Sequence, residues 1–387
     1  MERNLFDADH EAFRATVSAF LDRELVPRRA EWDETGMIDR TVFTRAGETG
    51  LLGTAAPAEF GGGGEPDFRF NVVLNEEIHR RGLNGPGLAF TLHNDIVLPY
   101  LLTHATPDQQ ERWLPGMCDG SLIGAVAMTE PGAGSDLAGI GTTAIRHGDR
   151  YVVNGAKTFI SSGINADIVV TAVKTDPSQR HRGLSLLVLE RGMPGFERGR
   201  RLRKVGLHAQ DTAELSFTEV EVPVENLLGA EGQGFALLAE CLVQERLSIA
   251  VTAVSAARAA LAWTLEHVGE RRLFGRALSE FQHARFVLAE IDTELEIAQS
   301  YVDRCTAAHL ENKLSAASAA KAKWWTTELQ KSVVDRCVQL HGGYGYMLEY
   351  PIGRAYQDAR ITTIYGGATE VMKEIVARSL LPDPVRG

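Results

Sequence analysis

GAVAMTEPGAGSDLAGIGTTAIRHGDRYVVNGAKTFISS, residues Gly124–Ser162, is the stretch on which the fold and the function of this chain depend. It holds a turn of small residues, Pro131–Ser135, between two segments that are typical of strands. Glycines in such a turn let a ligand approach the backbone where a Cβ would clash. The hydroxyl groups of Thr129 and Ser161 and the flat ring of Phe159 lie close to it in the sequence. The stretch therefore predicts a ligand-binding turn between strands.

The chain before this stretch has the pattern of helices. Apolar residues at three- and four-residue spacing predict a helix over residues 10–26 that ends at Pro27, and a second helix covers about Asn71–Arg81. Thr106 and Gln109 form a capping box at the start of a third helix. We therefore expect the first third of the chain to be mostly helical.

The pattern becomes β-like near Gly120. Asn154-Gly155 stands between Tyr151–Val153 and Lys157–Ile160 and is the strongest short hairpin signal in the chain. Further β-like runs, separated by Gly and Pro, are Ile168–Val173, Leu184–Leu189 and Glu214–Val222. These runs predict a compact β domain from about Ser121 to Leu228.

From Gly232 onward the helical spacing returns. Three runs exceed the ordinary length of a helix and a short fourth follows them: Phe235–Val268, Ser279–Leu310, Ser315–Leu340 and Thr369–Leu380. Long successive helices indicate a bundle. We therefore expect an α+β chain with a helical domain at 1–120, a β domain at 121–230 and a helical bundle at 231–387.

Composition argues against several classes of function. The 387 residues carry a net charge of −11 at pH 7, which is unfavourable for a nucleic-acid surface. The four cysteines form no CxxC pair and the eleven histidines lack paired spacing, so we predict no disulfide framework and no metal site. The acidic N-terminus is unlike a signal peptide, and Arg258 interrupts the longest apolar run, Leu247–Leu265. We expect a cytoplasmic protein without a membrane span.

Three blocks of sequence resemble the signatures of the acyl-CoA dehydrogenases, in order along nearly the whole chain. They are AMTEPGAGSD followed by NGAKTFISSG, GERRLFG at Gly269–Gly275, and the segment Cys337–Arg378. QERL at Gln244–Leu247 and IYGGATEVMKE at Ile364–Glu374 are most similar to the long-chain branch. The resemblance implies an N-terminal helical domain, a middle β-barrel-like domain, a C-terminal four-helix bundle and FAD as cofactor. A dinucleotide-binding turn is not indicated, because the glycines lack the G-x-G-x-x-G spacing.

The resemblance also implies an activity and its partners. The family removes hydrogen from an acyl-CoA thioester, here long-chain or branched, and forms the trans-2-enoyl-CoA. Electrons would pass to an electron-transferring flavoprotein, and the chain would assemble as a homotetramer, a dimer of dimers. No nucleic acid is expected as a partner.

Site residues follow from the resemblance position by position. Those expected against the flavin ring are Met128, Thr129, Phe159 and Ser161. Those expected at the FAD diphosphate and adenosine, partly of a neighbouring subunit, are Arg271, Phe274, Gln282, Gln339 and Gly343. Those expected at the CoA thioester are Ser135, Arg246, Tyr365, Gly366 and Arg378. Ala368 stands where the family often has Thr, so a flavin hydrogen bond from that position is left open.

The reaction needs a base that takes the α-proton, and its identity is the main question that the sequence raises. In the medium- and short-chain branches the base is a Glu after the Tyr of an IYEG segment, but this chain has Gly366 there. Glu245 is the candidate, because it falls on an apolar helical stripe with Cys241 and Ile249, where desolvation raises the pKa of a carboxyl group. Arg246 lies about 100° further around the helix and is not on the same face. The alternative for Glu245 is a buried salt bridge to another helix.

Two other functions remain open at this stage. A flavin oxidase or monooxygenase on the same fold would react with oxygen. A flavin- or CoA-binding protein without catalysis would explain the loss of the carboxylate at Gly366. Glu245 is the residue that discriminates between an enzyme and such a binding protein.

Overall fold

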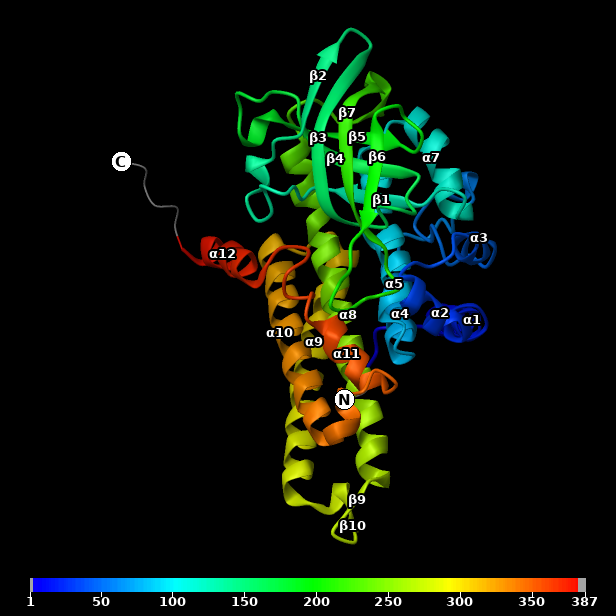
Figure 1. The fold of residues 1–387 in the computed structure, drawn as a ribbon, viewed down its shortest axis with the longest axis vertical. Coiled ribbons are helices and arrows are strands. Elements are labelled where there is room, and N and C mark those ends of the chain that lie inside the picture. Colours follow the sequence, from blue (N-terminus) through cyan, green and yellow to red (C-terminus); the bar gives the residue numbers. More distant parts are fainter. Residues whose placement is uncertain (1–2, 382–387) are drawn as a thin grey trace.

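The computed structural model describes residues 3–381, which form a sheet at one end of the molecule and a bundle of long helices at the other. The N-terminal helices pack along one side of both (Figure 1). The order of elements is helical, then β, then helical. The expected α+β class, with helices on either side of a central sheet region, is confirmed.

The N-terminal region consists of helices joined by short turns. They are α1 (Ala8–Phe20), α2 (Arg29–Thr35), α3 (Thr41–Glu48), α4 (Arg69–Arg80), α5 (Asn84–Thr91), α6 (Leu98–His104) and α7 (Pro107–Asp119). The capping box predicted for α7 is confirmed: the Thr106 N–H donates to Oε1 of Gln109 over 2.8 Å, and the Gln109 N–H donates to Oγ1 of Thr106 over 3.3 Å.

The expected stop at Pro27 is wrong. After α1 the chain continues as a π-helical turn, Leu21–Leu25, and a 3₁₀ turn, Val26–Arg28, which lead into α2. Pro27 occupies the first turn of a short helix. A missing N–H costs nothing in that position, so proline does not end the helical path there.

The middle of the chain forms one eight-stranded sheet. Its strands are β1 (Gly124–Ala127), β2 (Thr143–His147), β3 (Arg150–Ser161), β4 (Ile168–Lys174), β5 (Leu184–Glu190), β6 (Phe196–Arg201), β7 (Thr212–Pro223) and β8 (Leu227–Leu228). The order across the sheet is β6-β7-β3-β2-β4-β5-β8, and β1 pairs in parallel with β4. The turn of small residues that follows β1 therefore starts from the middle of the sheet.

The hairpin expected at Asn154-Gly155 is wrong. Both residues lie inside β3, and the hairpin turn joins β2 to β3 at Gly148, whose φ is +67°. The register between β3 and β7 shifts between Val153 and Gly155. A Cβ on Gly155 would lie 2.7 Å from Cα of Thr142, so the glycine serves a bulge and a close backbone approach.

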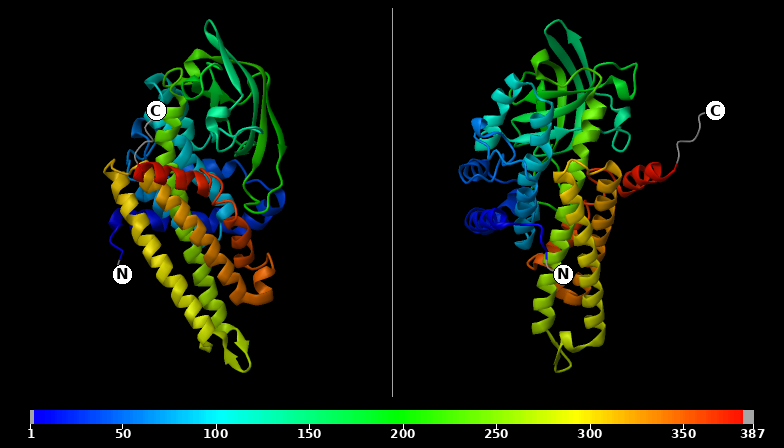
Figure 2. Two further views of the ribbon diagram at one scale, coloured as in Figure 1. Left: turned by 90° about the vertical axis from the view of Figure 1, so that its left-hand side faces the viewer. Right: turned by 180° about the vertical axis from the view of Figure 1, so that it is seen from behind.

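The C-terminal region is a bundle of long helices. It contains α8 (Gly234–Glu270), a small hairpin of β9 (Arg272–Leu273) and β10 (Arg276–Ala277), α9 (Gln282–Leu310), α10 (Ala316–His341), α11 (Pro351–Ala359) and α12 (Thr369–Leu380). Two further views show α8, α9 and α10 running together with the hairpin at their far end (Figure 2). The long helices begin and end within a few residues of the predicted runs.

Helix α8 connects the two ends of the molecule. Its first turns, at Leu237, Leu238 and Cys241, pack in a core shared with the sheet and α6, whereas Leu247 and the residues after it pack in the core of the bundle. In residues 3–381 α8 is the one helix long and apolar enough to cross a membrane, and 72% of its most apolar window is buried inside the protein. Core packing accounts for its apolar character.

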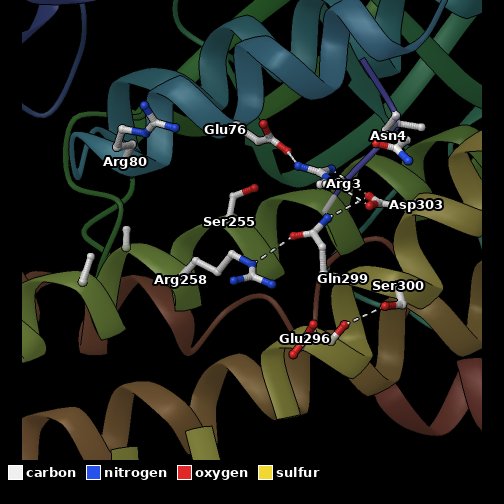
Figure 3. A pocket seen from close by; sticks show the side chains of 13 residues that line it. Arg3, Asn4, Glu76, Arg80, Ser255, Arg258, Glu296, Gln299, Ser300 and Asp303 are labelled. Carbon is white, nitrogen blue, oxygen red and sulfur yellow. Dashed lines mark hydrogen bonds and ion pairs between the residues drawn. The ribbon is translucent and has the colours of Figure 1, made fainter. Parts of the chain in front are cut away.

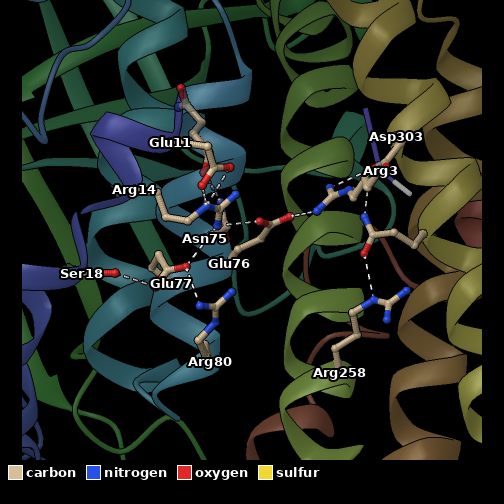
Figure 4. A network of polar contacts seen from close by, with 12 residues as sticks. Arg3, Glu11, Arg14, Ser18, Asn75, Glu76, Glu77, Arg80, Arg258 and Asp303 are labelled. Carbon is tan, nitrogen blue, oxygen red and sulfur yellow. Dashed lines mark hydrogen bonds and ion pairs between the residues drawn. The ribbon is translucent and has the colours of Figure 1, made fainter. Parts of the chain in front are cut away.

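A network of ion pairs ties the N-terminal helices to the bundle (Figure 4). Arg3 donates to both carboxylate oxygens of Asp303 on α9 over 2.7 Å and also pairs with Glu76 on α4. Arg14 on α1 bridges to Glu76 over 2.9 Å and to Glu77 over 3.1 Å. These partly buried ion pairs fix the positions of α1 and α4 relative to α9.

Candidate active site

Glu245 lies on α8 where the sheet region meets the bundle, and it is 6% exposed. Burial raises the pKa of this carboxyl group to about 7, against the smaller opposing effects of the charges on Arg246 and Lys323. Its Oε2 has no hydrogen-bond partner, and none of the ion pairs within residues 3–381 involves Glu245. The buried salt bridge considered from the sequence is therefore absent from the described structure, and the carboxyl group is free to meet a ligand.

Gly366 lies directly against this carboxyl group. A Cβ built on Gly366 would lie 3.3 Å from Oε1 of Glu245 and would clash with Cδ1 of Ile249. The φ of Gly366 is +63° and that of Gly367 is +99°, which favours glycine at both positions. The structure thus brings together the loop position that lacks a carboxylate and the helix position that has one.

Three further polar groups surround Glu245. Arg246 is buried and its Nε has no partner among the described residues. The side chain of Tyr365 lines a small cavity with Thr252 of α8, and burial raises its pKa. Tyr100 of α6 is fully buried, its hydroxyl has no partner in the described chain, and the charges on Glu245 and Arg246 act on it. Because buried polar side-chain atoms in proteins nearly always have a hydrogen-bond partner, these groups mark a candidate binding site.

The sequence interpretation missed Tyr100. Tyr100 sits in the apolar segment of α6, where it resembles any core aromatic residue. Only the packing of α6 against α8 brings its hydroxyl near Glu245.

The residues expected at the flavin ring follow β1 or lie at the end of β3, and these two strands contact each other. Met128 and Thr129 follow β1, and the Thr129 carbonyl accepts from the Thr158 N–H over 2.9 Å. Ser161 ends β3, and Phe159 is 67% exposed with φ +61°. A left-handed φ is uncommon outside glycine, and such residues cluster at active sites and ligand-binding segments.

A buried ion pair joins β3 to the segment that follows β1. The ammonium group of Lys157, which is fully buried, donates to the Met128 carbonyl over 3.0 Å and to Oε1 of Glu130 over 2.8 Å. Glu130 also accepts from the Gly141 and Thr142 N–H groups. The strand end that carries Met128 and Thr129 is therefore held rigidly.

The residues expected at the adenosine end of FAD lie elsewhere, at the far end of the bundle. Arg271 ends α8 and stacks over the ring of Tyr344 at 5.5 Å, and Phe274, at the tip of the β9–β10 hairpin, is 95% exposed. Gln282 begins α9, and Gln339 and Gly343 lie at the end of α10, where His341 stacks on His267 of α8. Twenty-five helical residues separate this end from Glu245, roughly 39 Å at 1.5 Å per residue. A single chain therefore does not bring the residues expected at the flavin ring together with those expected at the adenosine.

Both groups suit the parts of FAD expected there. The exposed ring of Phe159 and the hydroxyl groups of Thr129 and Ser161 suit an isoalloxazine. At the other end, an exposed guanidinium suits a diphosphate, and a Cβ on Gly342 or Gly343 would meet nothing within 4 Å, so a nucleotide can approach that backbone. The residues present therefore fit the cofactor when two chains contribute.

Ser135 and Arg378 are exposed. Ser135 is in the turn after β1, and Arg378 donates to Oε1 of Glu374 over 2.7 Å near the end of α12. Within residues 3–381 no cluster of His, Cys, Asp and Glu is arranged to hold a metal ion.

A separate cavity is not lined by Glu245. It has a volume of about 710 Å³ and lies between the N-terminal segment, α4, α8 and α9 (Figure 3). Its walls carry opposite charges that neutralise one another, among them Arg3 with Asp303 and Glu76. A mixed-charge cleft does not suit an acyl chain, so the candidate site remains the region around Glu245 and Gly366.

Comparison with known proteins agrees with this geometry. The chain matches the N-terminal domain model of acyl-CoA dehydrogenases over residues 7–121, the middle domain model over 125–220 and the C-terminal domain model over 232–381. It is 44% identical to the long-chain specific acyl-CoA dehydrogenase, mitochondrial, of Mus musculus, over 98% of this chain and 88% of that protein. It is 33% identical to the short-chain specific acyl-CoA dehydrogenase of Clostridium acetobutylicum, over 95% and 97% of the two chains.

A solved structure supports the same assignment. The acyl-CoA dehydrogenase of Geobacillus kaustophilus superposes with a TM-score of 0.95 at 48% identity, covering 98% of this chain and 100% of that one. The family resemblance stated from the sequence is thereby confirmed. The chain belongs to the acyl-CoA dehydrogenase family and is an FAD-dependent enzyme of that family.

Proposed function

We propose that this enzyme converts a long-chain or branched acyl-CoA thioester to the trans-2-enoyl-CoA, with Glu245 as the base. The observation that carries the proposal is the buried carboxyl group of Glu245, whose Oε2 has no partner and which lies beside Gly366. A carboxyl group with a pKa near 7 is half ionised at neutral pH, which suits a general base.

The residues around Glu245 have separate roles in this reaction. The carboxylate of Glu245 takes the proton as the Cα–H bond breaks, and negative charge develops on the thioester oxygen. The Gly366 N–H has no acceptor among the described residues, which supports its role as a donor to that oxygen. Arg246 and Tyr365 are proposed to line the thioester site. FAD, when bound, supplies the acceptor for the hydride from Cβ.

The cofactor residues are proposed to act across a subunit boundary. Met128, Thr129, Phe159 and Ser161 would meet the flavin of their own chain. Arg271, Phe274, Gln282, Gln339 and Gly343 would meet the adenosine half of the FAD of a second copy. Their separation by the length of α8 supports a homo-oligomer, proposed to be a tetramer formed as a dimer of dimers. Light scattering of the holoenzyme measures this assembly.

The long-chain preference, the electron acceptor and the location are inferred by analogy. The long-chain relative is more similar than the short-chain one, at 44% against 33% identity, which supports the longer substrate. An electron-transferring flavoprotein is the proposed electron acceptor. The proposed location is the cytoplasm, since the four cysteines are free and buried, which is consistent with a reducing compartment. A screen of saturated and branched acyl-CoA thioesters by kcat/KM tests the substrate class, with and without a purified electron-transferring flavoprotein.

Anaerobic reduction of the flavin tests the chemistry. Acyl-CoA should bleach the visible absorption of the wild-type holoenzyme, and Glu245→Gln should keep FAD but lose bleaching. Glu240→Gln is the matched control, because Glu240 is on the same helix and its side chain is 64% exposed. Turnover by Glu245→Gln would show that the base is elsewhere. Rapid reoxidation of the bleached enzyme in air would indicate an oxidase, and a colourless purified protein would indicate a binding protein.

A further inference from the structure

Lys323 is a lysine without solvent contact. It lies on α10, its side chain is 0% exposed, and its Nζ donates to the Gly367 carbonyl over 2.7 Å. Lysine is almost never fully buried unless a partner compensates the loss of hydration. Here the partner is the backbone of the turn that holds Gly366 against Glu245.

The charge of Lys323 also acts on Glu245 without forming an ion pair with it. Each of the two groups stabilises the charged form of the other, yet no contact of 4.0 Å or less joins them in the described chain. The titratable and charged groups facing Glu245 come from α8, α6, α10 and the turn after α11: Arg246, Cys241, Tyr100, Lys323 and Tyr365. Of these, two are cations, and only Lys323 is bonded to the Gly366-Gly367 turn.

We propose that Lys323 is a positioning residue for proton abstraction. Its hydrogen bond to the Gly367 carbonyl fixes the turn that presents the Gly366 N–H. Because Lys323 forms no ion pair with Glu245, its positive charge favours the ionised carboxylate without occupying the carboxylate oxygens. A direct salt bridge would occupy the carboxylate, whereas removal of the cation would disfavour its ionised form. This inference rests on the proposed role of Glu245 as the base.

The test compares Lys323→Met with Lys323→Arg in the holoenzyme. Loss of the cation in Lys323→Met should raise the pKa of Glu245 by about one unit, so kcat/KM at pH 6 should fall about tenfold and recover as the pH rises. Lys323→Arg keeps the charge and should keep the wild-type pH profile. Lys321→Met, two residues earlier on α10, is the control and should behave as wild type.

Ionisation of Glu245 can be followed independently of turnover. Infrared titration of the resting holoenzyme should show the protonated-carboxyl band that Glu245→Gln removes, and its midpoint should shift upward in Lys323→Met. If Lys323→Met does not fold, Lys323→Gln removes the same charge with a polar side chain. An unchanged midpoint and pH profile in the folded variant would overturn the role of Lys323. Turnover by Glu245→Gln would instead overturn the base assignment, so the two failures are distinguishable.

Discussion

Oε1 of Glu245 lies 3.3 Å from the position that a Cβ on Gly366 would occupy. One carboxyl group from α8 therefore occupies the space toward which a side chain from the loop would point. A side chain at position 366 would therefore be in tight contact with the Glu245 carboxyl group, and a base on the loop would crowd a base on the helix.

Gly366→Ala should destabilise the protein. The added Cβ would clash with Cδ1 of Ile249, and the φ of +63° is unfavourable for alanine, so we expect a loss of about 1–3 kcal/mol in the free energy of unfolding. Chemical denaturation measures it. Gly269→Ala is the control, because a Cβ there meets nothing within 4 Å and alanine favours a helix; it should be neutral or stabilising.

Activity should rise with pH through about 7. Burial raises the pKa of Glu245 to about 7, so the base is protonated below that value and kcat/KM should fall tenfold per pH unit there. Steady-state kinetics from pH 5 to pH 9, with a check of protein stability at each pH, measure the profile. A profile that is flat between pH 5.5 and pH 8 would contradict the assignment.

Glu245→Gln should stabilise the protein at pH 8 while abolishing activity. A carboxyl group whose folded pKa is raised binds more protons in the folded state between pH 4.5 and 7, so wild-type stability falls as the pH rises through that window. We expect the variant to gain on the order of 1–3 kcal/mol at pH 8 and little at pH 4.5. Thermal unfolding at both pH values measures the difference, and an equal effect at both would argue against a raised pKa.

Arg271→Ala should weaken FAD binding. The loss of a charge-assisted hydrogen bond costs about 1.5–3 kcal/mol, which corresponds to roughly tenfold to a hundredfold in Kd. Arg276→Ala is the control in the adjacent hairpin, since the guanidinium group of Arg276 is already engaged by Glu280 and by the ring of Phe281. Fluorescence titration of the FAD-free protein with FAD measures the Kd of both variants. Equal affinities for the two variants would place the diphosphate elsewhere.

Asp95→Ala should destabilise the junction between α8 and the N-terminal helices. The carboxylate of buried Asp95 accepts from Asn71 over 2.6 Å, from Asn75 over 3.0 Å and from Ser248 of α8, and all three donors would lose their acceptor. We expect a loss of about 2–4 kcal/mol in the free energy of unfolding. Asp136→Ala, which removes an exposed pair with Arg180, should cost at most about 1 kcal/mol.

The sequence determined those features that depend on neighbours along the chain. The spacing of apolar residues predicted a long helix from Phe235 to Val268, and in the structure this helix runs from Gly234 to Glu270. Thr106 and Gln109 form the predicted capping box at the start of α7. The stripe containing Glu245 also predicted its burial, because burial of a helix face follows from its own periodicity.

Local signals failed where a distant segment decided the outcome. Asn154-Gly155 has the composition of a hairpin turn, but close approach of Thr142 and the register with β7 place it in a bulge inside β3. The domain bounds at 120 and 230 and the roles of the site residues stay predictions.

Only the tertiary structure brought Lys323 of α10, Tyr100 of α6 and the Gly366 turn to the same carboxyl group. Nothing in the sequence neighbourhoods of Lys323 and Tyr100 distinguishes these two residues from core or surface ones. Their electrostatic effect on Glu245 depends on through-space distance and on the exclusion of water, and both arise only when the helices pack.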